Sequence, residues 1–163
     1  MLFTFAVITC SDKGSNNQRE DVSGKRIIEI LENKNYKNIY YKIVPDEKDE
    51  IKSALIEASE NNANLIITTG GTGFYKRDVT PEATLEVIEK LVPGIPELIR
   101  YKTGLINEKS YLSRGVAGIH KNSLIINLPG SPKAVQECLE AIFNILEHGL
   151  NILLENENEC GKQ

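Results

Sequence analysis

Short apolar runs alternate along the chain with longer stretches in which apolar residues recur at helical spacing. The short runs have the length of buried strands and lie at 2–9, 38–44, 64–68 and 123–128. Strands that alternate with helices are typical of a parallel sheet covered on its faces. The sequence therefore predicts an α/β fold with three layers, a mostly parallel sheet and helices on both faces.

Helical spacing marks the segments that cover this sheet. Apolar residues recur at such spacing over 22–31, 51–58, 85–91 and 135–153, the last being the clearest stripe. A further helix is predicted between Pro93 and Gly104. The segment "YLSRGVAGIHKNSLIINL" predicts a hairpin that turns at Lys121 and Asn122.

Length and composition limit the class of protein. The chain has 163 residues, which predicts one domain over 1–154, followed by a polar tail at 155–163 that has nothing to bury. The net charge of -4 argues against a nucleic-acid surface, which needs clustered Lys and Arg. The apolar start is too short for a membrane span and lacks the basic residues of a signal peptide. The three cysteines have no metal-finger spacing and are expected as free thiols, so we expect a cytoplasmic protein without membrane or nucleic-acid partners.

Chemically unusual segments follow four of the predicted strands. Ligands of doubly wound sheets bind beyond the carboxyl ends of the strands, so these segments are where function is sought. Ser11 and Asp12 follow the first strand, and Asp46 follows the second in "PDE". The fourth segment, "LPGSPKA", has Ser131 and Pro132 in the order of a helix cap and a first helical position.

The third segment, "TTGGTGFYKRDVTPEAT", is rich in glycine. Gly70, Gly71 and Gly73 leave backbone N–H groups free to form an anion-binding nest. Thr80 before Pro81 predicts an N-cap, so the positive end of that helix would also face the loop. The spacing fits neither a P-loop nor the dinucleotide fingerprint, and glycines after a strand can also make only a tight turn. The residues by themselves predict a phosphate-handling site of a nonstandard type.

Two carboxylates accompany this loop. Asp46 and Asp78 would repel a phosphate unless a cation lay between them, and Mg²⁺ binds through one or two carboxylates together with phosphate oxygens and water. Each also has a structural alternative, since Asp78 could cap a local turn and Asp46 could start the helix at Glu47. Further positive charge could come from basic residues, although these commonly only solvate a surface: Lys76, Arg77, Arg114 and Lys133.

These motifs together resemble a known family. The glycine-rich segment, with "SD", "DVSG", "IVPDE", "LSRGVAGI" and "LIINLPGSPKA", is similar in order and over nearly the whole chain to the molybdopterin adenylyltransferases of the MogA type. The same domain forms the amino-terminal part of gephyrin. The resemblance implies a nucleotidyltransferase that joins AMP from Mg-ATP to the terminal phosphate of molybdopterin and releases pyrophosphate. It also implies a homotrimer and a downstream protein that inserts molybdate.

The resemblance assigns roles to matching positions. It implies that Asp46 and Asp78 hold Mg²⁺ and take part in catalysis. The ATP and molybdopterin cleft would be formed by the glycine loop and by residues of the neighbouring segments: Gly70, Gly71, Thr72, Gly73, Thr80, Ser11, Asp12, Ser113, Arg114, Pro129, Gly130, Ser131 and Pro132.

Two other functions compete with the enzyme. A MoaB-like sister branch shares the glycine loop, and some of its members lack one or both acidic motifs, so a non-catalytic pterin-binding or carrier protein is the first alternative. A scaffold module is the second. Retention of both "PDE" and "RDVTPEAT" favours the enzyme, whereas "GVAGI" resembles the sister branch equally well.

Overall fold

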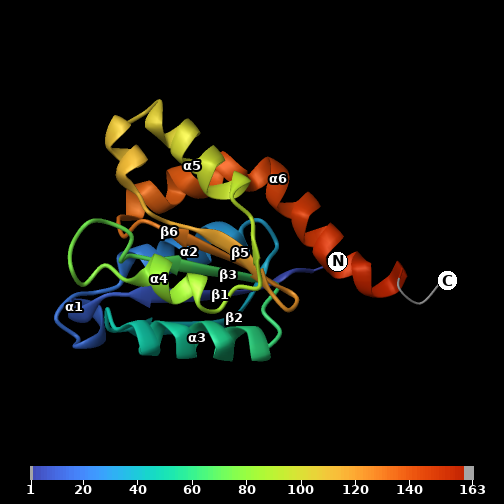
Figure 1. Ribbon diagram of the computed structural model, residues 1–163, viewed down its shortest axis with the longest axis horizontal. Helices are drawn as coiled ribbons and strands as arrows, with labels where there is room; N and C mark the ends of the chain where they lie inside the picture. The colour runs from blue at the N-terminus through green and yellow to red at the C-terminus, as the bar shows by residue number, and fades with distance from the viewer. Residues whose placement is uncertain (1, 160–163) are drawn as a thin grey trace.

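A six-stranded mixed sheet forms the centre of the computed structural model, which describes residues 2–159 (Figure 1). The order of its strands is β2-β1-β3-β6-β5-β4. Pairings are parallel from β2 through β6 and antiparallel from β6 through β4. The strands are β1 (Thr4–Cys10), β2 (Lys37–Val44), β3 (Leu65–Thr69), β4 (Lys90–Leu91), β5 (Ala117–His120) and β6 (Ser123–Leu128).

Helices cover both faces of the sheet, as Figure 1 shows. They are α1 (Asp12–Ser15), α2 (Val22–Glu32), α3 (Lys48–Glu60), α4 (Thr80–Leu85), α5 (Gly94–Gly104), the 3-10 helix η1 (Glu108–Leu112) and α6 (Pro132–Glu159). One apolar cluster joins α2, α5 and α6 to one face, and a second joins α3 and α4 to the other. The predicted three-layer fold with a mostly parallel sheet is confirmed.

Strand periodicity explains how one sheet supplies two cores. Successive side chains of a strand point to opposite faces. Phe5 and Val7 of β1 accordingly lie in the cluster with α2 and α6, whereas Ala6 and Ile8 lie in the cluster with α3. All four are fully buried. Each large apolar side chain buried in this way contributes about 1.5–3 kcal/mol, and the central strands therefore fix the positions of the loops that leave them.

One predicted helix is shorter than its apolar spacing suggested. The stripe over 85–91 predicted a helix, but α4 ends at Leu85, and Leu91 lies in β4 opposite Gly118 of β5. Pairing with the edge of the sheet therefore prevails over the local period. The predicted hairpin is confirmed, because His120 pairs with Ser123 across the turn and Lys121 has a φ of +51°.

The last helix is long and runs past the sheet, as Figure 1 shows. With 28 residues, α6 spans about 42 Å. It continues to Glu159 and so includes the first part of the expected polar tail, while residues 160–163 lie outside the described part of the chain. No helix within residues 2–159 is long and apolar enough to cross a bilayer.

Candidate functional site

The four segments singled out in the sequence leave the sheet at one edge. Cys10 pairs with Val44, and Thr69 pairs with both Thr9 and Leu128, so the carboxyl ends of β1, β2, β3 and β6 are aligned. This alignment brings the segments after these strands together, although they are far apart in the sequence.

The glycine loop after β3 has a backbone conformation that residues with a side chain rarely adopt. Gly70 has a φ of +95° and Gly71 a φ of +68°, both in the left-handed region that favours glycine. A Cβ at Gly70 would lie 2.4 Å from the carbonyl oxygen of Cys10. Within residues 2–159, the N–H groups of Gly71, Thr72 and Gly73 donate no hydrogen bond. These free donors fit the predicted anion nest.

Thr80 fixes this loop through two hydrogen bonds to its backbone carbonyls. Its Oγ1 donates to the carbonyl of Gly70 at 2.9 Å, its N–H donates to the carbonyl of Gly71 at 3.2 Å, and the residue is fully buried. The predicted N-cap is wrong, because α4 has Val79 at its N-cap and no capping side chain. The hydroxyl that would cap the helix is committed to the loop carbonyl instead.

Arg114 braces the same loop from the side. Its N–H donates to the carbonyl of Thr72 at 2.9 Å, Nε donates to the carbonyl of Gly73 at 2.7 Å, and Nη2 donates to the carbonyl of Asp78 at 2.8 Å. Nη1 pairs with Glu82. The guanidinium therefore holds both ends of the turn at 73–78 and is directed to the protein.

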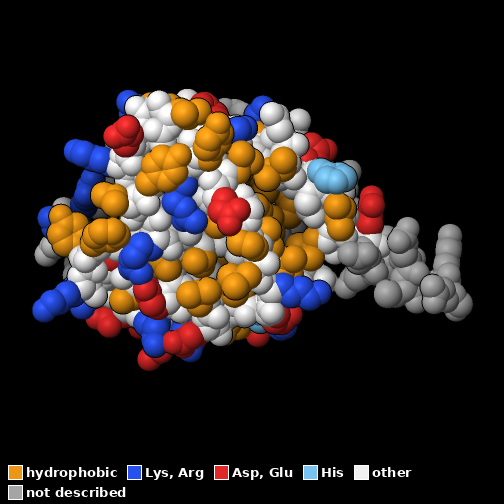
Figure 2. Space-filling view, turned by 45° about the horizontal axis from the view of Figure 1, so that its top comes forward, with side chains coloured by type: hydrophobic (Ala, Val, Ile, Leu, Met, Phe, Trp, Pro, Cys, Tyr) orange, Lys and Arg blue, Asp and Glu red, His pale blue; other side chains and the backbone are white. Residues whose placement is uncertain are grey.

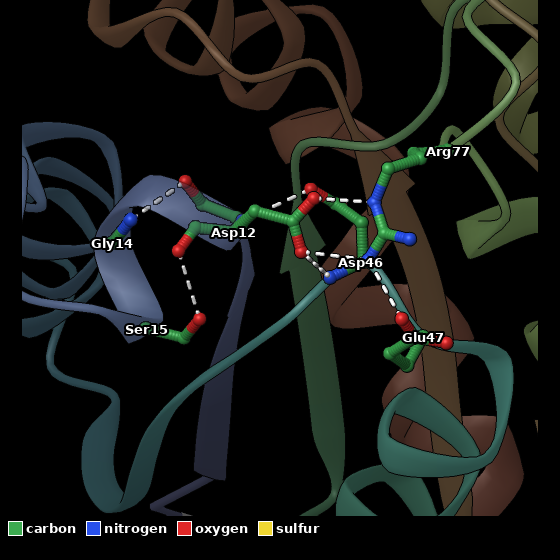
Figure 3. Close-up of polar contacts among 7 residues, drawn as sticks. Asp12, Gly14, Ser15, Asp46, Glu47 and Arg77 are labelled. Carbon is green, nitrogen blue, oxygen red and sulfur yellow. Dashed lines mark hydrogen bonds and ion pairs between the residues drawn. The ribbon is translucent and has the colours of Figure 1, made fainter.

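Asp46 has a carboxylate oxygen that accepts no hydrogen bond among the described residues. Its Oδ2 accepts the N–H of Asp12 at 3.0 Å, and its own N–H donates to Oδ1 of Asp12 at 3.0 Å (Figure 3). Its Oδ1 is buried and has no partner among the described residues. Burial raises the pKa of Asp46, and the charges of Asp12 and Asp78 act in the same direction, while the hydrogen bond from Asp12 opposes them. A cation at Oδ1 would offset the cost of this buried charge.

The two structural alternatives for the acids have different outcomes. Asp46 does not start a helix, since Glu47 is the N-cap of α3 and makes no capping bond with its side chain. Asp78 does cap a local turn, because its Oδ2 accepts the N–H of Tyr75 at 3.0 Å. Its Oδ1 accepts no hydrogen bond from residues 2–159 and stays open to a ligand.

Asp46 and Asp78, whose charges interact, suit Mg²⁺ better than zinc. The described residues contain no group of three or more His, Cys, Asp or Glu side chains arranged for a metal. Mg²⁺ needs only one or two carboxylates, because phosphate oxygens and water complete its shell. The orphaned Oδ1 of Asp46 and the free Oδ1 of Asp78 fit that donor set.

Two cavities flank the glycine loop. The η1 cavity, of about 300 Å³, lies between the loop, α5, η1 and the start of α6, and the α2 cavity, of about 270 Å³, lies on the other side beside α1 and α2. Predicted residues divide between them. The η1 cavity is lined by Thr72, Gly73, Ser113 and Pro129, and the α2 cavity by Ser11, Gly70, Gly130 and Pro132.

Two predicted residues serve as helix caps at this edge. Oγ of Ser11 accepts the N–H of Gly14 and caps α1, and Oγ of Ser131 accepts the N–H of Ala134 at the start of α6, as its position before Pro132 suggested. Both bonds measure 3.0 Å.

Sequence reasoning missed Asn127 in the η1 cavity. It is buried, and its amide donates to Oγ1 of Thr68 at 3.0 Å and to Oγ1 of Thr84 at 2.9 Å. The signal was an amide inside the apolar run "LIINL". Residues from α5, among them Arg100 and Thr103, were also missed, because helical packing gives no local sign of which side chains reach a cavity.

The side of the molecule with α5 and η1 exposes many apolar side chains. Figure 2 turns this side forward and shows them gathered among charges of both signs. The most exposed large apolar residues of this segment are Tyr101, Leu105, Ile106, Tyr111 and Leu112, and the tip of the glycine loop adds Phe74 and Tyr75.

Comparisons with known proteins identify similar proteins whose names refer to molybdopterin. A family model described as a probable molybdopterin binding domain matches residues 6–148. A molybdopterin adenylyltransferase of Helicobacter pylori is 45% identical over 153 residues, which are 92% of this chain and 87% of the relative. One of Pyrococcus furiosus is 42% identical over 155 residues, 90% of each chain. The crystal structure of the molybdopterin biosynthesis enzyme MoaB from Thermus thermophilus superposes with a TM-score of 0.87 at 43% identity and covers 93% of this chain and 96% of that one.

Proposed function

Because the chain belongs to the family of probable molybdopterin binding domains, we propose that it is a molybdopterin adenylyltransferase of molybdenum cofactor biosynthesis. The reaction joins AMP from ATP to the terminal phosphate of molybdopterin and releases pyrophosphate. The observation that carries the catalytic proposal is the buried, unpartnered Oδ1 of Asp46, which lies beside an anion nest and near a second carboxylate.

Each cavity would take one substrate. Their volumes, about 300 and 270 Å³, lie at the lower end for ligand pockets, so neither would enclose both molecules. The glycine loop contributes Thr72 and Gly73 to one and Gly70 to the other. Two ligands that enter from opposite sides would therefore bring their phosphates together at this loop.

The chemistry requires alignment and charge stabilisation. A terminal phosphate oxygen of molybdopterin attacks the α-phosphorus of ATP, and the bond from that phosphorus to the pyrophosphate oxygen breaks, leaving pyrophosphate. The N–H groups of Gly71, Thr72 and Gly73 would bind phosphate oxygens, and the fixed loop would hold the two reactants in line. Mg²⁺, held by Asp46 and Asp78, would offset the charge that develops on the phosphate oxygens.

A direct assay tests this proposal. Purified protein is incubated with molybdopterin, ATP and Mg²⁺, and adenylated molybdopterin and pyrophosphate are quantified by chromatography. We expect equal amounts of both products, far above a control without protein. Tight binding of molybdopterin without either product would instead identify a non-catalytic carrier of the MoaB-like kind.

The oligomeric state and the cellular location are proposed from the family to which the chain belongs. We propose a cytoplasmic homotrimer that hands its product to a molybdate-insertion protein. The exposed apolar side chains of α5 and η1 support burial against another subunit. Light scattering is expected to give three times the chain mass of 18.2 kDa, and a mass of 18.2 kDa would refute the trimer.

A further inference from the structure

We propose that Arg77 is a positioning residue that latches the turn carrying Asp78 against the segment carrying Asp46, and so sets the separation of the two carboxylates before metal binds. This inference rests on the metal site of the proposed function. It concerns a side chain whose role neither the family description nor the relatives' names specify.

Arg77 forms a fork across the site. Its Nε lies 2.5 Å from Oδ2 of Asp12, and its Nη2 lies 2.9 Å from Oδ1 of Asp12 and 2.7 Å from Oε1 of Glu47 (Figure 3). Two parallel bonds to one carboxylate fix the plane of a guanidinium as well as its distance. The third bond adds a second anchor on a different segment.

The anchors adjoin the metal carboxylates in the chain. Arg77 directly precedes Asp78, and Glu47 directly follows Asp46. Asp12 exchanges two backbone-to-carboxylate hydrogen bonds with Asp46, each of 3.0 Å. The fork therefore connects the segments after β1, β2 and β3 beside both carboxylates.

The turn at 73–78 has little else to hold it on this side. The side chains at its tip, Phe74 and Tyr75, are 72% and 85% exposed, so no apolar burial anchors it. Arg114 holds the carbonyls of Gly73 and Asp78 from the other side. Arg77 supplies the opposing attachment toward Asp46.

A lysine at this position would separate geometry from charge. Lysine keeps the positive charge but cannot make the planar fork to both oxygens of Asp12 and to Glu47. Simple removal of the charge would confuse the result, because loss of a cation beside acidic groups favours metal binding by Coulomb attraction. The informative variant is therefore Arg77→Lys. Arg26→Lys is the matched control, since Arg26 also forms a fork between two helices, to Glu29 and Gln136, away from the metal carboxylates.

The test measures metal binding directly, with Mn²⁺ alone as the probe and electron paramagnetic resonance as the readout. We expect Arg77→Lys to raise the Kd for Mn²⁺ about 10-fold, at the lower end for residues that orient metal ligands, and Arg26→Lys to leave it unchanged. In the AMP-transfer assay, saturating Mg²⁺ is expected to restore the rate of Arg77→Lys, with the KM values for ATP and molybdopterin unchanged. Thermal unfolding of both variants confirms that they are folded.

An unchanged Mn²⁺ affinity in folded Arg77→Lys would overturn the latch. If the KM values for ATP and molybdopterin rose in the same variant, Arg77 would instead be a ligand of substrate phosphate. Failure of the proposed function is distinguishable, because a wild-type protein without AMP transfer whose Mn²⁺ affinity still depends on Arg77 would support the latch and refute the enzyme.

Discussion

Replacement of Asp46 by Asn is expected to remove most AMP transfer while making the metal-free protein more stable. Burial raises the pKa of Asp46 above its ordinary value of 3.8, so the ionised carboxylate destabilises the folded state. The stability gained by Asp46→Asn therefore appears as the pH rises from about 3.8 through the raised pKa, and it persists at pH 7. For catalysis, loss of a group that stabilises transition-state charge costs about 2.7–4 kcal/mol, or 10²–10³ in kcat.

The stabilisation of the folded protein by Mg²⁺ provides a second, independent measure of the effect of Asp46→Asn. At a Mg²⁺ concentration 100 times the Kd, wild-type protein gains about 2.7 kcal/mol. For a chain of this size that corresponds to a rise in Tm of about 5 to 10 °C. Asp46→Asn should start from a higher Tm without Mg²⁺ and show almost none of this rise.

The assay pairs calorimetry, with and without Mg²⁺, with the rate of pyrophosphate release. Asp49→Asn is the matched control, because Asp49 is an exposed carboxylate in the first turn of α3. Its replacement should change neither the Mg²⁺-dependent rise in Tm nor the rate of pyrophosphate release. A normal Mg²⁺-dependent rise in Tm for Asp46→Asn would refute the assignment of Asp46 as a metal ligand. A lower Tm in the absence of Mg²⁺ would show that its carboxylate is structural.

Two substitutions and one labelling experiment test the loop and the first strand. Gly71→Ala should destabilise the protein by about 2 kcal/mol in urea unfolding and weaken ATP binding, because φ at Gly71 is +68° and the new Cβ would lie 2.3 Å from Oγ1 of Thr80; unchanged unfolding would contradict the strained geometry. Thr80→Val should cost about 1–3 kcal/mol, since it leaves the carbonyl of Gly70 without its buried donor, and the same denaturation curves measure it. Cys10, whose pKa burial raises to about 12, should resist iodoacetamide at pH 8 in folded protein, and rapid labelling seen by mass spectrometry would contradict its burial.

The parallel part of the fold could be predicted because its signals are local. Buried parallel strands appear as short apolar runs, and "LIITT" and "LIINL" mark β3 and β6 without reference to the rest of the chain. The two-residue β4 has no such signal. Leu91 continues the helical spacing of Leu85 and Ile88, and only its pairing opposite Gly118 makes it a strand.

The placement of Asp46 and Asp78 at one edge of the sheet could also be predicted, because parallel strands place their carboxyl ends there. The charge of Asp78 helps to raise the pKa of Asp46. What each side chain does there could not be predicted. The sequence places Thr80 at a helix start, but its hydroxyl bonds the carbonyl of Gly70 because the loop passes directly over it. Such contacts depend on a loop path that local residue types do not determine.

The hydrogen-bond partners of the two arginines determine which groups remain to balance the negative charge of the substrate phosphates. Arg114 and Arg77 could have supplied positive charge to phosphates, but both are directed to carbonyl and carboxylate oxygens of the protein. The donors left open at the loop are the N–H groups of Gly71, Thr72 and Gly73, which carry only partial charge. We therefore infer that phosphates bound beside Asp46 and Asp78 would be stabilised by a metal cation. It follows that ATP affinity should depend far more steeply on Mg²⁺ than on monovalent salt.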